Sequence, residues 1–216
     1  MCIRDSSWPV ILNLKEENPE IIKAIKLTRN YGQHNAIICG FEYASGEFFI
    51  TMDEDLQHNP FDIELLINKQ KEEDFDVVYG EYEELSHNYF RNTTSILIRK
   101  ILSKAVEGLS HNYSAFRLIK KEIAQQTTKM LNSYTFLDGY LSWITKNVGS
   151  TLVSHEERFS GNSGYTLKKL LNHFANILFT FSSLPIKFLS TLSILIFLAT
   201  VVYSAYLISL KLIYNN

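Results

Sequence analysis

Residues 48–60 read Phe48-Phe49-Ile50-Thr51-Met52-Asp53-Glu54-Asp55-Leu56-Gln57-His58-Asn59-Pro60. The apolar first part predicts a β-strand that ends in two carboxylates one residue apart. Residues i and i+2 of an extended backbone point the same way, so Asp53 and Asp55 are expected to converge on one divalent cation. Hard oxygen ligands of this kind suit Mg²⁺ or Mn²⁺, which commonly also hold substrate phosphates. The alternative is a polar turn in which Asp55 or Asn59 caps the next helix.

Strand-like and helix-like patterns alternate on both sides of this stretch. Strands are predicted over residues 21–27, 47–52, 76–79, 116–119 and 151–155, and helices over 10–17, 33–44, 61–73, 88–106, 121–130 and 136–146. Gly80 is expected to end the third strand. This alternation predicts an α/β layer fold with a mainly parallel sheet. Ligands of such sheets lie at the carboxyl ends of the strands, where Asp53 and Asp55 occur.

The pattern changes after Tyr165. An apolar stripe between Leu167 and Phe181 predicts an amphipathic helix that lies along a membrane interface, with a core helix as the alternative. Phe188 to Leu210 contains no charged residue. At ~1.5 Å per residue this run is about 34 Å long, enough to cross a hydrocarbon core of about 30 Å.

Charge and composition indicate which classes of binding partner and which compartment suit the protein. The net charge is −2, which gives no indication of a nucleic-acid partner. Cys2 and Cys39 are too few for a disulfide framework and suit a reducing compartment. The lysines before the apolar run, at 168, 169 and 187, outnumber the single Lys211 after it. This bias favours a catalytic part that faces the cytoplasm, with the chain anchored in the cell membrane.

The first six residues, Met-Cys-Ile-Arg-Asp-Ser, are not a signal peptide, because no apolar core follows them. Their reverse translation resembles the end of a transposon-based sequencing adapter. We interpret residues 1–6 as a sequencing artefact joined to a truncated gene, with a natural N-terminus as the alternative.

Several motifs occur in an order that resembles a known family. They are Leu27 to Ile37, Gly40, Ala44 to Glu47, Met52 to Pro60, Ser114-Ala115-Phe116-Arg117-Leu118 and Arg158 to Thr166. Together they resemble the polyprenyl-phosphate glycosyltransferases of glycosyltransferase family 2, of the dolichyl-phosphate mannose synthase and bactoprenol glucosyltransferase type. The resemblance extends from about Ile21 to the C-terminus. It implies truncation at the N-terminus, and at the C-terminus as well, because related enzymes commonly carry two membrane helices.

The resemblance also implies an architecture. Residues 7–164 would form a partial GT-A-like domain of the nucleotide-diphospho-sugar transferase type. Residues 165–183 would form the amphipathic interfacial helix, and residues 184–216 a transmembrane helix with a short tail. The partners would be a nucleotide-diphosphate sugar, a polyprenyl phosphate and the lipid bilayer. A second copy of the chain remains an open alternative.

Site residues follow from the matched motifs. Asp53, Asp55 and Gln57 would contact the metal or the diphosphate. His58 is expected to be a solvent-facing turn residue, with an approach to the metal as the alternative. Arg117 and Arg158 would bind phosphate, because a guanidinium group binds phosphate oxygens bidentately. Further phosphate contacts would come from Ser163 of the Gly161–Gly164 turn. Plain surface or turn roles are the alternatives for these three residues.

The strand predicted before residue 28 is followed by Arg29 and Asn30. They would meet the nucleotide or pyrophosphate, or else fix the turn into the next helix, with Asn30 as a cap.

One departure from the family pattern concerns an acidic residue. Many relatives have Gly-Asp-Phe-Arg where this chain has Ser114-Ala115-Phe116-Arg117. Asp138 is the candidate replacement, with a helix-surface aspartate as the alternative. The reaction implied is a metal-dependent, inverting transfer of a sugar to a polyprenyl phosphate for cell-envelope glycan or glycoconjugate synthesis. The rivals are a family 2 transferase with a saccharide acceptor and a non-catalytic membrane assembly protein.

Overall fold

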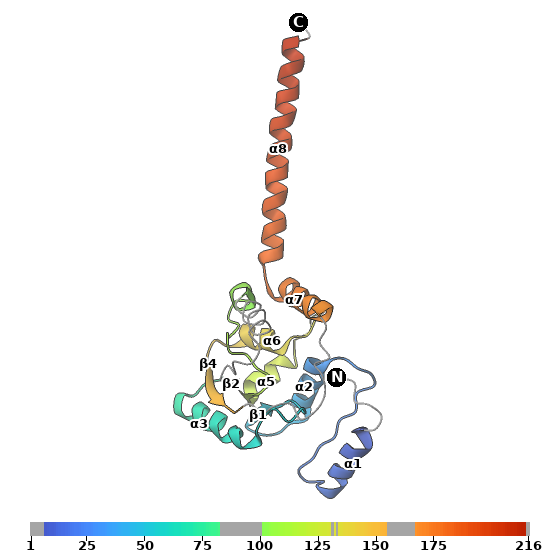
Figure 1. Ribbon diagram of the computed structural model, residues 1–216, viewed down its shortest axis with the longest axis vertical. Helices are drawn as coiled ribbons and strands as arrows, with labels where there is room; N and C mark the ends of the chain where they lie inside the picture. Colours follow the sequence, from blue (N-terminus) through green and yellow to red (C-terminus); the bar gives the residue numbers. More distant parts are fainter. Residues whose placement is uncertain (1–6, 83–100, 131, 133, 155–166, 215–216) are drawn as a thin grey trace.

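A four-stranded sheet with helices on both faces forms the body of the computed structural model, and one long helix projects from it (Figure 1). The structure describes residues 7–82, 101–130, 132, 134–154 and 167–214. The strands are β1 (Phe48–Thr51), β2 (Val77–Tyr82), β3 (Arg117–Lys120) and β4 (Val148–Val153). The helices are α1 (Ser7–Glu17), α2 (Gln33–Tyr43), η1 (Pro60–Asp62), α3 (Ile63–Glu73), α5 (Lys121–Thr127), α6 (Leu137–Ile144), α7 (Leu167–Phe181) and α8 (Leu184–Tyr214).

The sheet has the strand order β1-β3-β2-β4. β3 is antiparallel to both β1 and β2, whereas β2 and β4 are parallel. The sheet is therefore mixed, and the prediction of a mainly parallel sheet is wrong. The α/β class itself is confirmed, because α2, α5 and α6 lie on one face of the sheet and α3 lies on the other.

Each face of the sheet carries its own apolar core. The cluster beneath α2, α5 and α6 contains Phe41, Phe49, Val77, Tyr79, Ile119, Ala124, Leu137 and Leu141. The cluster beneath α3 contains Leu66, Val78, Phe116, Leu118 and Val153. Successive residues of β2, Val77 and Val78, point to opposite faces and are both fully buried. Such burial on both faces is typical of a central strand covered by helices.

The helix that follows the carboxylate turn forms where the sequence predicts it. Asn59 caps η1, since its Oδ1 accepts a hydrogen bond from the Phe61 N–H at 3.1 Å, and Pro60 occupies the first helical position. α3 then ends at Asp74, which adopts a left-handed conformation with φ 52°.

Two strand predictions are wrong. Residues 21–27 alternate in sequence, yet they adopt no regular structure and Ile21 is 83% exposed. No strand of the described chain pairs with them. β2 also continues through Gly80 instead of ending there. A Cβ at this position would lie 2.9 Å from Phe116 Cδ1 and 3.0 Å from Val153 Cγ2, so the glycine permits close packing within the strand.

Residues 101–105 of the predicted 88–106 helix are helical, and residues 88–100 lie outside the described chain.

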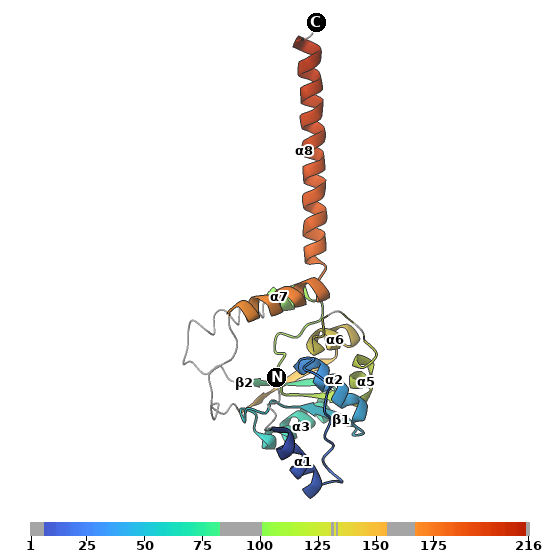
Figure 2. The ribbon, with the colours of Figure 1, turned by 90° about the vertical axis from the view of Figure 1, so that its right-hand side faces the viewer.

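α7 joins the globular body to α8. It lies crosswise between the two, as Figure 2 shows. Its buried residues Ile177 and Phe181 pack with Phe136 and Tyr140 of the α6 region. Leu171 and Phe179 are 54% and 68% exposed, so the same helix also presents apolar residues to its surroundings.

α8 is 31 residues long with a mean hydropathy of 2.1 in its most apolar part, none of which is buried. At ~1.5 Å per residue it extends about 46 Å. Within the described chain it is the one helix long and apolar enough to cross a membrane.

Candidate functional site

The sequence motifs converge at one edge of the sheet. Because β1 and β2 are each antiparallel to β3, and β4 is parallel to β2, the strands β1, β2 and β4 all run in one direction. Their carboxyl ends, at Thr51, Tyr82 and Val153, therefore share an edge with Arg117 at the start of β3. Ligands are expected at this edge from the sequence, and the fold brings two described motifs to it, Met52–Pro60 and Ser114–Leu118.

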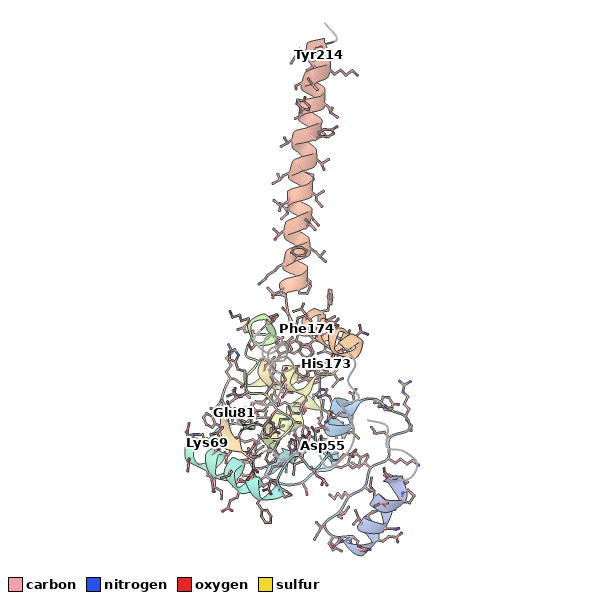
Figure 3. All side chains as sticks on the ribbon, in the orientation of Figure 1. Asp55, Lys69, Glu81, His173, Phe174 and Tyr214 are labelled. Carbon is pink, nitrogen blue, oxygen red and sulfur yellow. The ribbon has the colours of Figure 1, made fainter. Side chains whose placement is uncertain are left out.

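The carboxylate turn begins where β1 ends. The half-buried residues Asp53, Asp55 and Gln57 alternate along the chain with the exposed residues Met52, Glu54 and Leu56. The backbone bends over residues 54–56, and Leu56 has a φ of 61°. The alternation therefore arises in a bent turn and not in the continuous extended strand assumed from the sequence. Figure 3 shows Asp55 in the globular part of the molecule, below α7.

Two hydrogen bonds orient the acidic side chains. Gln33, the first residue of α2, donates from Nε2 to Asp53 Oδ1 at 2.6 Å. Asp55 Oδ1 lies 3.4 Å from the backbone N–H of Gln57, which donates to it. No local pattern predicts the contact from Gln33, which lies 20 residues from Asp53.

The donor set fits a hard divalent cation. Two carboxylates and the Gln57 amide supply oxygen ligands, as Mg²⁺ and Mn²⁺ prefer. Among the residues that the structure describes, no cluster of three or more His, Cys, Asp or Glu side chains forms a closed metal site. Metal binding by this turn therefore stays a proposal, in which further ligands would have to come from substrate phosphates and water.

His58 is buried, with 8% of its surface exposed, so the expectation of a solvent-facing histidine is wrong. Its Nδ1 accepts a hydrogen bond from the Asp53 N–H at 3.0 Å. Its Nε2 lies 2.6 Å from the Tyr82 hydroxyl, and its ring stacks on Phe116 at a centroid distance of 5.1 Å. The residue directly after the motif therefore links β1, β2 and β3.

Arg117 and Asp138 form an ion pair in the core, between β3 and the first turn of α6, with 2% and 4% of their side chains exposed. Asp138 Oδ1 also accepts a hydrogen bond from the Tyr79 hydroxyl at 3.1 Å. Burial and the Asp138 carboxylate raise the pKa of Tyr79 well above its ordinary value, so its hydroxyl stays protonated. The interpretation of Asp138 as a helix-surface residue is wrong.

Arg117 also contacts the end of β1, the strand that leads into the carboxylate turn. Arg117 Nε donates to Thr51 Oγ1 at 3.2 Å, and Thr51 Oγ1 donates to the Ala115 carbonyl at 2.6 Å. Thr51 lies two residues before Asp53. In this conformation the guanidinium group of Arg117 thus holds the sheet together beneath the turn. Its predicted contact with phosphate remains a proposal.

A second histidine lies against the ion pair. His34 of α2 accepts a hydrogen bond at Nδ1 from the Leu137 N–H at 3.4 Å. The pKa of His34 is lowered to about 4, mainly by burial; the Asp138 carboxylate opposes this shift, whereas Arg117 and His173 add to it. His34 is therefore neutral near pH 7.

Arg158 and Ser163 lie outside the described residues, but the residue that precedes their segment is fixed. Ser154 donates from its backbone N–H and its Oγ to Asp62 Oδ2, at 2.7 and 2.5 Å. Asp62 belongs to η1, which follows the carboxylate turn. The segment with Arg158 therefore begins beside the elements that carry Asp53 and Asp55.

Arg29 and Asn30 are exposed residues in the loop before α2. Asn30 Oδ1 accepts a hydrogen bond from the Gly32 N–H at 2.9 Å, and the Arg29 guanidinium lies 4.6 Å from the centroid of the Tyr31 ring. Gly32 has a φ of 87° and precedes the first residue of α2. Asn30 thus fixes the turn before α2, but the N-cap position is Gly32 and no side chain caps the helix, so the interpretation of Asn30 as a cap is wrong. A contact of Arg29 or Asn30 with the nucleotide stays a prediction.

The chain resembles several characterised bacterial proteins. It is 30% identical over 212 residues to an undecaprenyl-phosphate 4-deoxy-4-formamido-L-arabinose transferase from Photorhabdus laumondii, covering 98% of this chain and 65% of the relative. A Yersinia pestis protein of the same name is also 30% identical over 212 residues, with 98% and 64% covered. The chain thus spans just under two thirds of the length of these relatives.

Solved structures support the fold. Glucosyl-3-phosphoglycerate synthase from Mycobacterium tuberculosis, in complex with Mn²⁺ and uridine-diphosphate-glucose, matches with a TM-score of 0.51 and 14% identity. The match covers 82% of this chain and 63% of that one. The same enzyme with phosphoglyceric acid also bound matches with a TM-score of 0.52 and 15% identity, with 82% and 64% covered. The predicted GT-A-like fold is therefore confirmed.

The family model for glycosyl transferase family 2 matches residues 2–129. These residues include α2, β1, the carboxylate turn, α3, β2 and β3. This match covers more than half of the chain, and the resemblance stated from the sequence motifs is confirmed. The chain therefore belongs to glycosyl transferase family 2.

Proposed function

We propose that the protein transfers a sugar from a nucleotide-diphosphate sugar to a polyprenyl phosphate at the cytoplasmic face of the cell membrane. One observation carries this proposal: the carboxylate turn lies at the sheet edge to which the fold also brings the Ser114–Leu118 motif, in a body joined through α7 to an apolar helix of 31 residues. The relatives are undecaprenyl-phosphate sugar transferases by name, which supports the acceptor class. The uridine-diphosphate-glucose bound to the Mycobacterium tuberculosis enzyme of the same fold supports the donor class.

Asp53, Asp55 and Gln57 would hold the divalent cation, Mg²⁺ or Mn²⁺. When bound, such a cation neutralises negative charge that grows on the departing diphosphate. Gln33 and His58 keep the turn in place for this role through the side chain and the backbone of Asp53. The Mn²⁺ in the Mycobacterium tuberculosis enzyme of the same fold supports this assignment.

The acceptor phosphate is already ionised near neutral pH, so the site needs cations more than a strong base. Arg158 and Ser163 are the proposed phosphate contacts, because Asp62 anchors the start of their segment near the turn. Arg117 is almost fully buried beside Asp138, so a direct contact with the phosphate would require the buried pair to become exposed. We therefore assign Arg117 and Asp138 a supporting role in this conformation, in place of the catalytic role proposed for Asp138.

Arg29 and Asn30 lie in the loop that precedes α2. The first residue of α2, Gln33, contacts Asp53. This position supports the proposal that they meet the nucleotide. The Arg29 guanidinium lies over the face of the Tyr31 ring, and its N–H donors in the guanidinium plane can still bind a phosphate or a ribose.

The cytoplasmic orientation rests on lysines 168, 169 and 187 before the apolar run, against Lys211 after it. α7 would lie along the interface, since it crosses the base of α8 and exposes Leu171 and Phe179 (Figure 2).

The test uses membranes from cells that express the protein. They are incubated with radiolabelled sugar nucleotides of the UDP and GDP classes, Mn²⁺ and undecaprenyl phosphate, and then extracted with organic solvent. The proposal predicts label in the organic phase that mild acid releases as free sugar. Label only on water-soluble saccharide would support the rival transferase. A complete lack of sugar-nucleotide binding and transfer would support the membrane assembly protein.

A further inference from the structure

His58 is held in a single orientation by three neighbours. Nδ1 accepts from the Asp53 N–H at 3.0 Å, Nε2 lies 2.6 Å from the Tyr82 hydroxyl, and the ring lies nearly parallel to the rings of Tyr82 and Phe116, at centroid distances of 5.9 and 5.1 Å. A backbone N–H only donates, so Nδ1 carries no proton. The neutral ring therefore has its proton on Nε2 and donates it to the Tyr82 oxygen.

The hydrogen bond from Asp53 to His58 closes the turn that carries both acidic residues. The closed segment includes the bend over residues 54–56 and Leu56 at a φ of 61°. A left-handed conformation is unfavourable for an ordinary residue such as leucine. Such a conformation persists only where surrounding contacts determine it. The buried His58 ring supplies such a contact from the protein interior, whereas the turn itself lies at the surface.

We propose that His58 is a positioning residue for the metal-binding turn, and that it acts by fixing the Asp53 backbone to the end of β2. This inference rests on the proposed function. Without the Nδ1 acceptor, the Asp53 N–H loses its partner and the turn samples other conformations. The cation then binds a less ordered pair of carboxylates, and its affinity falls. The Tyr82 hydroxyl contributes indirectly, because it fixes the orientation of the imidazole ring.

Two substitutions separate this role from simple packing. In His58→Asn, the side-chain oxygen occupies the place of Nδ1 and accepts from the Asp53 N–H. In His58→Gln, the amide reaches toward Tyr82, near the place of Nε2, and leaves the Asp53 N–H without its acceptor. Both variants remove the stacked ring, so a role in packing alone predicts equal effects of the two.

The first measurement uses no metal. Amide hydrogen exchange of Asp53 is followed by NMR in the detergent-solubilised protein. We expect protection to persist in His58→Asn and to fall about fivefold in His58→Gln, as the loss of one hydrogen bond implies. Equal exchange in the two variants would overturn the proposal.

The second measurement is the binding of Mn²⁺ alone, followed by the electron paramagnetic resonance signal of the free ion. We expect the dissociation constant to rise about fivefold in His58→Gln and to change less than about twofold in His58→Asn. Tyr82→Phe keeps the stacked ring and should give an intermediate loss. If His58→Gln does not fold, His58→Asn alone tests the proposal. This variant keeps an acceptor at the place of Nδ1, so loss of Asp53 amide protection in it would contradict the proposed role of Nδ1.

Asp53→Asn distinguishes failure of the positioning role of His58 from failure of metal binding by the carboxylate turn. Loss of Mn²⁺ binding in Asp53→Asn, together with equal binding in His58→Asn and His58→Gln, would reject the role of His58 alone. Unchanged Mn²⁺ binding in Asp53→Asn would reject the metal-binding turn itself.

Discussion

At the scale of single residues, the Arg117–Asp138 pair determines how the site is supported. Both side chains are almost fully buried, and a buried charge without its partner is costly. We expect Asp138→Asn to lower the free energy of unfolding by about 3–5 kcal/mol. Chemical denaturation in detergent measures this loss.

The paired control is Arg117→Met combined with Asp138→Leu, which removes both charges and keeps apolar volume. We expect it to recover much of the stability, because a buried ion pair is often replaceable by apolar residues. An Asp138→Asn variant of normal stability that has lost sugar transfer would contradict the supporting role and favour a catalytic one.

His34 gives the folded protein a pH dependence. Its folded pKa of about 4 lies below the ordinary value of 6.5, so the unfolded chain binds a proton first as the pH falls. The stabilisation is therefore complete above about pH 6.5 and is lost as the pH falls to about 4, amounting to about 3 kcal/mol at most. His34→Asn keeps an acceptor for the Leu137 N–H and does not titrate. We expect its free energy of unfolding to change less with pH across this window than that of the unsubstituted protein, and parallel pH curves would contradict the assignment.

The sequence points to candidate acidic residues for the site but not to the residues that support them. Asp53, Asp55 and Gln57 stand in a short motif that can be recognised locally. Gln33 and Tyr82 contact this motif from α2 and β2, and no spacing rule reveals such contacts. His58 was misjudged because a polar residue after a turn is usually solvated, whereas here the ends of three strands surround it.

At the scale of the elements, α6 and α7 are joined by a close contact at Gly139. A Cβ at Gly139 would lie 2.5 Å from Phe181 Cδ1 and Cε1, which is closer than atoms can approach. We therefore expect Gly139→Ala to displace α7 and to lower the free energy of unfolding by about 1–3 kcal/mol.

Gly40→Ala is the matched control, because Gly40 also lies in a helix and nothing lies within 4 Å of its added Cβ. Alanine favours helix by up to about 1 kcal/mol over glycine, so this variant should be neutral or more stable. Equal destabilisation by both substitutions would contradict the specific packing of α6 on α7.

Local patterns predicted most helices and strands, because their apolar periodicity matches their burial. The pattern over residues 21–27 failed because alternation makes a strand only where a partner strand is present. The mixed direction of the sheet was also missed. β3 reverses relative to β1 and β2, and this depends on a connection between β2 and β3 that carries no directional signal in the sequence.

At the scale of the whole molecule, α8 is the candidate membrane anchor of the globular body. α8 has no buried residue, and its exposed apolar surface needs a nonaqueous environment. We expect the protein to remain in the membrane pellet after carbonate washing, and a chain ended after Ser183 to be released. Retention of the shortened chain would contradict anchoring by α8.

The central claim is that the carboxylate turn acts through a bound divalent cation in transfer of sugar to polyprenyl phosphate. The most direct measurement compares initial rates of lipid-linked product formation, as Mn²⁺ is titrated, for Asp55→Asn, Asp53→Asn and Glu54→Gln. Glu54 is the matched control, because it is an exposed acid between the two proposed ligands. We predict that each aspartate variant loses about a hundredfold or more in rate while Glu54→Gln stays within about threefold. Equal rates in all three variants, or full activity in the presence of a chelator, would contradict the account.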